Sequence, residues 1–193
     1  MKKEPFLIFC LVFYTGMTML GLLLARGFAS LEPFRKPLIL ETATTGLGMA
    51  ILLGVAAGTA SGMSLRTRAG RKMVVELSRL LPDLHAGDHL LIALASGIGE
   101  ETLFRGALLP MLGLPLSSIL FGAMHWPFRP SLRLWTLYAL VMGLALGGLA
   151  LYTGSVWFPV LTHALANFLG FRLISRLRRR RLPASPATGP VFP

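Results

Sequence analysis

Apolar side chains form six runs along this chain, and the short connections between the runs carry most of the charge. A helix needs about 20 mainly apolar residues to cross the hydrocarbon core of a bilayer. The runs predict six transmembrane helices. They cover residues 6–25, 38–60, 89–109, 114–126, 132–151 and 156–171. The fourth run would span only roughly 20 Å as a helix, so we expect it to be broken or shielded inside the bundle.

The composition supports an integral membrane protein. Hydrophobic residues make up 54% of the 193 positions and charged residues only 14%, against about 25% charged in ordinary soluble domains. We find no internal repeat and no linker long enough to separate two domains. The sequence therefore predicts an all-α, polytopic helical bundle. We expect one domain over residues 1–182, followed by a Pro-rich and Ala-rich disordered tail at 183–193.

The positions of Lys and Arg predict the orientation of the helices, because short cytoplasmic connections are enriched in these residues. With a cytoplasmic N-terminus, six spans put both termini and most of the basic residues on the cytoplasmic side. Only Arg26, Arg35 and Lys36 fall on the other side, and Arg105 lies within a span. The abundance of Arg, Ala, Gly and Leu is typical of a GC-rich bacterium, so we expect a multi-pass protein of the bacterial inner membrane.

The net charge of +11 could indicate nucleic acid binding. The basic residues, however, cluster beside helix ends, where anionic lipid attracts each of them by roughly 1 kcal/mol. An amphipathic stretch at residues 71–81 has Arg71, Lys72 and Arg79 opposite its apolar positions and ends at Pro82. We therefore expect anionic lipid at the cytoplasmic face as a partner, and no nucleic acid.

Several ionisable or amide side chains lie inside the apolar runs. A charged group near the centre of a bilayer costs at least about 2.5 kcal/mol, so such groups face one another or water and usually mark function. One protein class that uses them is the proton-coupled membrane carrier, although transporters usually contain inverted repeats and none is visible here. The residues are Glu100, Glu101, Arg105, His125, His163 and Asn167.

Helical spacing separates a structural pair from a free carboxylate in the third run. Glu101 and Arg105 are four residues apart and lie on one face of the helix, where they can neutralise each other as a brace. Glu100 is turned about 100° from Glu101 and has no basic residue at helical spacing within its own segment. Glu100 is therefore free for another task.

The same spacing recurs in the fourth and sixth runs. His163 and Asn167 can point at one location and donate hydrogen bonds together, and Phe121 shares a face with His125. Each of these groups alone could be a satisfied packing residue. Together with an unpaired Glu100 they would multiply the desolvation cost without a purpose, so we favour a functional site.

Three motifs resemble those of the CPBP family, which includes CAAX prenyl endopeptidases and bacteriocin-processing proteins. They are Glu100-Glu101-x-x-x-Arg105, Phe121-x-x-x-His125 and His163-x-x-x-Asn167. Each motif alone is weak, but three in order on separate spans are specific, and the similar core extends over about residues 88–172.

The resemblance implies an intramembrane endopeptidase of the glutamic type without a cofactor. Glu100 and His125 would activate a water molecule, and His163 and Asn167 would stabilise the oxyanion of the tetrahedral intermediate. Glu101, Arg105 and Phe121 would support the site structurally. General base catalysis and preorganised donors are suitable chemistry for hydrolysing a peptide bond.

Two alternatives remain within the same resemblance. Glu100, His125 and His163 could bind zinc and leave a fourth position for water, but the sequence has no His-Glu-x-x-His motif and few nearby carboxylates to orient the imidazoles. We therefore expect metal-independent hydrolysis. A non-catalytic immunity or scaffold protein that binds a peptide without cleaving it would carry the same motifs.

The expected substrate is a membrane-associated protein or peptide. Members of the resembling family cut prenylated C-termini, process leader peptides, act on signalling peptides or, in myxosortase-like bacterial members, trim C-terminal sorting anchors. The bacterial character of the composition makes a prenylated substrate the least expected of these. The sequence does not select one of the others.

Overall fold

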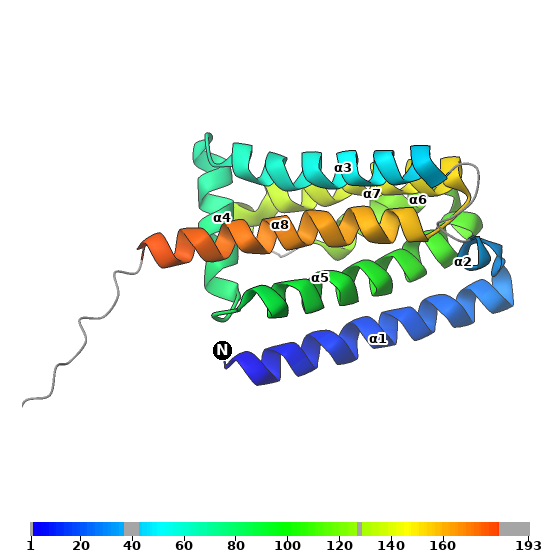
Figure 1. The fold of residues 1–193 in the computed structure, drawn as a ribbon, viewed down its shortest axis with the longest axis horizontal. Helices are drawn as coiled ribbons and strands as arrows, with labels where there is room; N and C mark the ends of the chain where they lie inside the picture. Colours follow the sequence, from blue (N-terminus) through cyan, green and yellow to red (C-terminus); the bar gives the residue numbers. More distant parts are fainter. Residues whose placement is uncertain (1, 37–42, 127–128, 182–193) are drawn as a thin grey trace, which may run out of the picture.

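The structure is a computed structural model that describes residues 2–36, 43–126 and 129–181. Within these ranges every regular element is helical and no strand occurs (Figure 1). Four helical stretches in these ranges are long and apolar enough to cross a membrane, as judged by length and composition. The predicted all-α membrane bundle is confirmed, whereas the number of segments that cross the bilayer stays a prediction.

The first, second, fifth and sixth apolar runs each form one long helix. These helices are α1 (Lys3–Phe28), α3 (Ala43–Ser64), α7 (Arg133–Thr153) and α8 (Trp157–Arg181). Residues 38–42 of the second run, and the predicted disordered tail at 183–193, lie outside the described residues. The short helices α2 (Glu32–Arg35) and η2 (Pro130–Leu132) lie in connections.

The third and fourth runs join into one interrupted helix of 39 residues. It begins as α5 (Ala86–Glu101), widens into a π-helix, η1 (Thr102–Leu108), and continues as α6 (Leu109–Met124). Inside α6, Gly113 has φ 77° and ψ 170°, a conformation that glycine adopts without strain. The short fourth segment is therefore broken from the third at this glycine. The sequence did not predict the π-helical turn.

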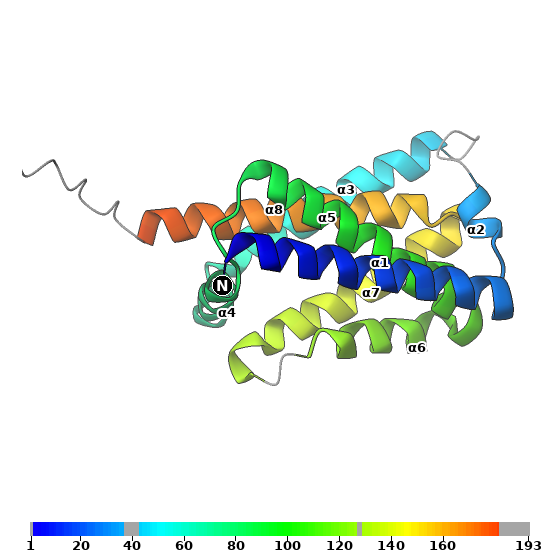
Figure 2. The same cartoon turned by 90° about the horizontal axis from the view of Figure 1, so that it is seen from below.

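Close helix contacts build the bundle around α8, which packs mainly against α3 and α5, while α6 pairs with α7 (Figures 1 and 2). Helix α1 packs on α5 and on the π-helix. At Gly21, a Cβ atom would lie 2.8 Å from the backbone of Leu103. The absence of a side chain at Gly21 thus lets α1 lie directly against η1, as small residues do in membrane bundles.

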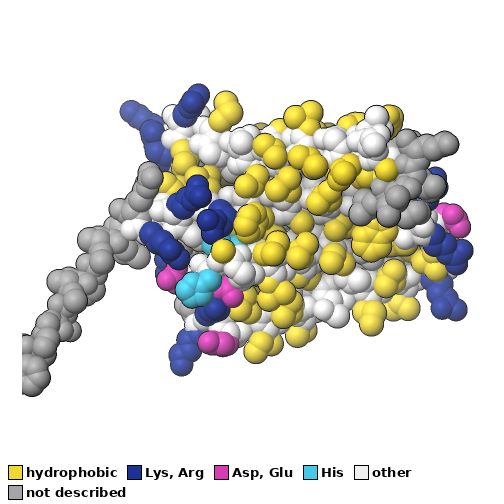
Figure 3. Space-filling view, in the orientation of Figure 1, with side chains coloured by type: hydrophobic (Ala, Val, Ile, Leu, Met, Phe, Trp, Pro, Cys, Tyr) yellow, Lys and Arg dark blue, Asp and Glu magenta, His cyan; other side chains and the backbone are white. Residues whose placement is uncertain are grey.

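Charged side chains gather at the two ends of the molecule, with an apolar belt between them (Figure 3). The N-terminus and the end of α8 lie at the same end (Figure 1). The amphipathic helix α4 (Arg68–Leu80) crosses this end. Helix α4 confirms the predicted amphipathic stretch but begins earlier, because the Thr67 hydroxyl caps it by accepting a hydrogen bond from the Gly70 amide at 3.0 Å.

Candidate active site

The predicted brace is present at the junction of α5 and the π-helix. Arg105 donates from Nη1 to Oε1 of Glu101 at 3.0 Å, and both side chains are almost fully buried. The second amino group of Arg105, Nη2, donates to the backbone oxygen of Gly143 on α7 at 3.1 Å. The guanidinium of Arg105 also lies 4.4 Å from the ring centroid of Phe121, within cation–π range. One side chain therefore ties together three helices.

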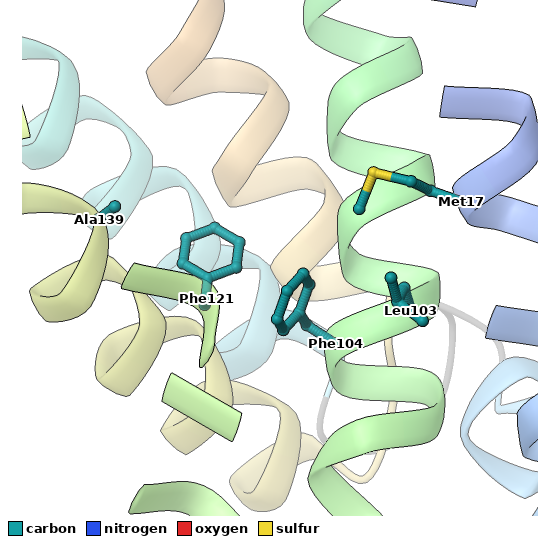
Figure 4. Close-up of a cluster of buried hydrophobic side chains, with 5 residues drawn as sticks. All are labelled: Met17, Leu103, Phe104, Phe121 and Ala139. Atoms are coloured by element: carbon teal, nitrogen blue, oxygen red, sulfur yellow. The ribbon is translucent and has the colours of Figure 1, made fainter. Parts of the chain in front are cut away.

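Phe121 belongs to a buried apolar cluster beside this brace (Figure 4). Its ring meets that of Phe104 edge to face, with centroids 4.9 Å apart. The other members shown are Met17, Leu103 and Ala139. Because these residues come from α1, the π-helix, α6 and α7, the cluster packs these four elements together beside the polar groups.

His125 lies directly after the last residue of α6. Its Nδ1 atom is 2.8 Å from the backbone oxygen of Phe121, and because a carbonyl oxygen only accepts, Nδ1 carries the hydrogen. In the neutral ring the lone pair is then on Nε2, which faces Oε2 of Glu100 at 3.7 Å. The ring edge also meets Trp135, with centroids 5.2 Å apart.

His163 lies between the two adjacent glutamates. Its Nδ1 atom is 2.6 Å from Oε1 of Glu101, and its Nε2 atom is 3.9 Å from Oε2 of Glu100. Oε2 of Glu100 is buried and has no hydrogen-bond partner within the described part of the chain. Both imidazoles thus direct Nε2 toward one unpartnered carboxylate oxygen, at separations that one bridging water can fill.

Asn167 is one helical turn beyond His163, but its amide does not donate to the same group. Its Nδ2 atom donates to the hydroxyl of Ser96 on α5 at 2.9 Å. Ser96 is fully buried and precedes Glu100 by about one helical turn. Sequence reasoning missed Ser96, and the only available signal was its position on the same face of α5 as Glu100.

One cavity of about 600 Å³ brings the predicted catalytic residues together. Apolar side chains from α1, α4, α7 and α8 form most of its wall, and Tyr14 of α1 contributes a phenol that the sequence did not single out. The cavity extends from the polar groups to α4. This helix lies at the end of the molecule that holds the N-terminus and the end of α8, which we call the basic end. The residues predicted to act in catalysis that line it are Glu100, His125, His163 and Asn167.

The side chains of Glu100, His125 and His163 are spaced slightly too widely to bind one zinc ion as they stand. Ligand atoms on one tetrahedral zinc lie roughly 3.4 Å apart, and the Nε2 atoms of His125 and His163 lie 3.7 and 3.9 Å from Glu100. Among the described residues, no group of three His, Cys, Asp or Glu side chains is arranged to hold a metal ion. The donors would have to approach one another by a few tenths of an ångström.

The surroundings of the two imidazoles differ from the sequence prediction. We expected few carboxylates to be available to orient the imidazoles, but Glu101 contacts Nδ1 of His163 at 2.6 Å, and a backbone oxygen fulfils this role for His125. Such partners orient an imidazole equally well for a metal ion or for a water molecule.

A multi-pass helical bundle with a buried carboxylate and two imidazoles at the wall of an apolar cavity has the groups that an intramembrane hydrolase needs. Residues 84–169 match the family described as type II CAAX prenyl endopeptidase Rce1-like. No curated protein and no solved structure matches the chain. The matched residues carry the domain of a CAAX-type intramembrane protease within the CPBP family, which confirms the predicted resemblance.

The family match gives the general activity of the matched domain, and the apolar helices give its setting. The domain is that of a peptide hydrolase, its substrate is a membrane-associated protein or peptide, and the chain is a multi-pass membrane protein. The match covers less than half of the chain and includes the predicted site residues from Glu100 to Asn167. A myxosortase-like activity stays a prediction.

Proposed function

We propose that this chain hydrolyses a peptide bond with a water molecule activated by Glu100 and His125, without a metal ion. The observation that carries the proposal is the buried Oε2 of Glu100. It has no hydrogen-bond partner among the described residues and faces Nε2 of both His125 and His163. A water between these groups would donate one hydrogen to Glu100 and the other to His125. Its free lone pair would then face the peptide carbonyl.

In the proposed reaction, the water oxygen bonds to the carbonyl carbon while Glu100 takes one proton from the water. The carbonyl oxygen becomes the oxyanion of a tetrahedral intermediate. When the C–N bond breaks, Glu100 returns the proton to the leaving amine, so that a carboxylic acid and an amine are released. A side chain that accepts and then returns one proton accelerates both steps.

His163 and Asn167 would stabilise the oxyanion. Because the Glu101 carboxylate accepts only, Nδ1 of His163 carries a hydrogen, and the ring can also donate from Nε2 if it is an imidazolium. In that state two carboxylates, at Glu100 and Glu101, balance one guanidinium and one imidazolium. The cluster then has no net charge, which lowers the cost of burying it.

Glu101, Arg105 and Phe121 would act as structural support. Their contacts join α5, the π-helix, α6, α7 and α8 within one layer of the bundle. A π-helical turn is common at functional sites. Here it would hold Arg105 against Gly143 and keep Glu100 directed toward the cavity.

The apolar wall of the cavity supports a substrate with an apolar segment next to the cleaved bond. The basic end of the molecule, which carries α4, supports a cytoplasmic position for both termini and contact with anionic lipid, in a bacterial inner membrane. We propose no nucleic acid partner. We propose that residues 1–182 form one domain.

Comparative membrane proteomics of three strains tests the proposed function. The strains express the wild-type chain, no chain, or the Glu100→Gln variant at equal abundance. We expect at least one new peptide terminus that is present only in the wild-type strain. A terminus that persists with Glu100→Gln would contradict the role of Glu100, and a non-catalytic scaffold would produce no wild-type-specific terminus at all.

A further inference from the structure

Three side-chain hydrogen bonds cross between the antiparallel helices α5 and α8, one above another. The first, at the catalytic level, joins Glu101 to His163, and the last, near the basic end, joins His89 to Ser175 at 2.9 Å. The middle one joins Ser96 to Asn167. Of the three, the middle bond is the one that holds the side-chain amide of Asn167.

The chemistry of Ser96 determines which end of the Asn167 amide it holds. The Ser96 hydroxyl has a single hydrogen, which it donates to the backbone oxygen of Ala93 at 3.1 Å. Toward Asn167 the hydroxyl can therefore only accept, so it binds the amide nitrogen and excludes the amide oxygen. The second N–H of Asn167 is left for another acceptor.

The surroundings of Ser96 give this contact little freedom to move. Ser96 is fully buried, and at the next residue, Gly97, a Cβ atom would lie only 3.0 Å from the backbone oxygen of Val160 on α8. The two backbones are thus close together at this level. Packing of this kind preserves a hydrogen bond and, with it, the orientation of the amide.

We infer that Ser96 is a positioning residue for the proposed reaction, which acts by directing an N–H of Asn167 toward the oxyanion. The inference rests on the proposed function. Without Ser96 the amide can turn over and present its oxygen, which would repel a developing negative charge. The preorganised donor that an oxyanion requires would then be populated for only part of the time.

A double-mutant cycle with the purified full chain and a substrate identified by the proteomics tests this inference. We expect Ser96→Ala to lower kcat by about tenfold, the rate equivalent of one ordinary hydrogen bond, with KM unchanged. We expect Asn167→Ala to lower kcat by about 100-fold or more. In the Asn167→Ala background, Ser96→Ala should cause no further loss, because its partner is already absent.

Ser175→Ala is the matched control. It also removes a serine hydroxyl that joins α5 to α8, but at the level of His89. It should leave kcat unchanged. If Ser96→Ala cannot be recovered folded, Ser96→Cys replaces it, because a thiol has similar size and is a weaker acceptor. The expected loss with Ser96→Cys is then a severalfold decrease in kcat, again absent in the Asn167→Ala background.

Two results would overturn the inference and are distinguishable from each other. An equal loss from Ser96→Ala in both backgrounds would show that Ser96 acts on the bundle in general, while Asn167 keeps its proposed role. Wild-type kcat in Asn167→Ala would remove Asn167 from the proposed oxyanion site, and the inference about Ser96 would fail with it.

Discussion

The Nδ1 atom of His163 lies 2.6 Å from Oε1 of Glu101, the same carboxylate oxygen that accepts a hydrogen bond from Arg105. One oxygen therefore joins the buried brace to an imidazole of the proposed reaction. From the sequence we expected Glu101 to pair with Arg105 alone. The added contact gives Glu101 influence over the orientation and the charge of His163.

Glu101→Gln should destabilise the fold and also slow the reaction. The substitution leaves the buried guanidinium of Arg105 without a negative partner, a change that typically costs about 3 to 5 kcal/mol. It also removes the carboxylate that holds Nδ1 of His163 in place. Thermal unfolding in detergent, together with kcat of the folded fraction, measures the two effects separately.

Glu32→Gln is a suitable comparison for that variant. Glu32 forms an exposed ion pair with Arg35 at 3.6 Å, and such pairs contribute little to stability. Glu32→Gln should unfold at the wild-type temperature. If Glu101→Gln also unfolds at the wild-type temperature, the buried brace does not stabilise the bundle as described.

Gly21→Ala should weaken the packing of α1 on the π-helix. The new methyl group would lie 2.8 Å from the backbone of Thr102 and Leu103, and neither backbone can move without displacing the adjacent Glu101. Overpacking of this kind costs about 1 to 3 kcal/mol. A lowered unfolding temperature in detergent would report the loss.

Gly16→Ala controls for the change in helix propensity in the same helix. Apart from the adjacent residues and the backbone of α1 itself, nothing lies within 4 Å of a Cβ atom placed at Gly16. Gly16→Ala should therefore leave the unfolding temperature unchanged or raise it slightly. Equal effects of the two alanines would mean that α1 does not contact the π-helix closely.

Chelation discriminates between the proposed water-based reaction and the zinc alternative. Incubation of the purified protein with a strong chelator, followed by its removal, should leave the cleavage rate unchanged, because no proposed step passes through a metal ion. If activity is lost on chelation and returns with added zinc, the result would indicate that Glu100, His125 and His163 bind a zinc ion.

The sequence predicted the helices but not the turn that shapes the site. Long apolar runs are a strong signal, because a bilayer requires both length and low charge. The π-helix at Thr102–Leu108 leaves no such signal. It changes only the spacing of backbone hydrogen bonds, which depends on packing against α1 and α7. The break at Gly113 lies just before the fourth run, whose short length had led us to expect that it is broken or shielded.

The candidate site was predictable in its members and less so in its contacts. Spacing of four residues paired Glu101 with Arg105 and grouped His163 with Asn167. The structure joins the first pair by a hydrogen bond and places the second pair at one cavity. Contacts between helices could not be predicted from spacing. The sequence alone does not reveal that Asn167 binds Ser96 or that Arg105 binds the backbone oxygen of Gly143.

Cleavage by the purified Glu100→Gln variant is the most direct test of the account. Glutamine has nearly the shape of glutamate but cannot take a proton from water, so we expect kcat to fall at least about 100-fold while abundance and unfolding temperature match the wild type. Wild-type kcat in this variant would contradict the proposal that Glu100 is the base.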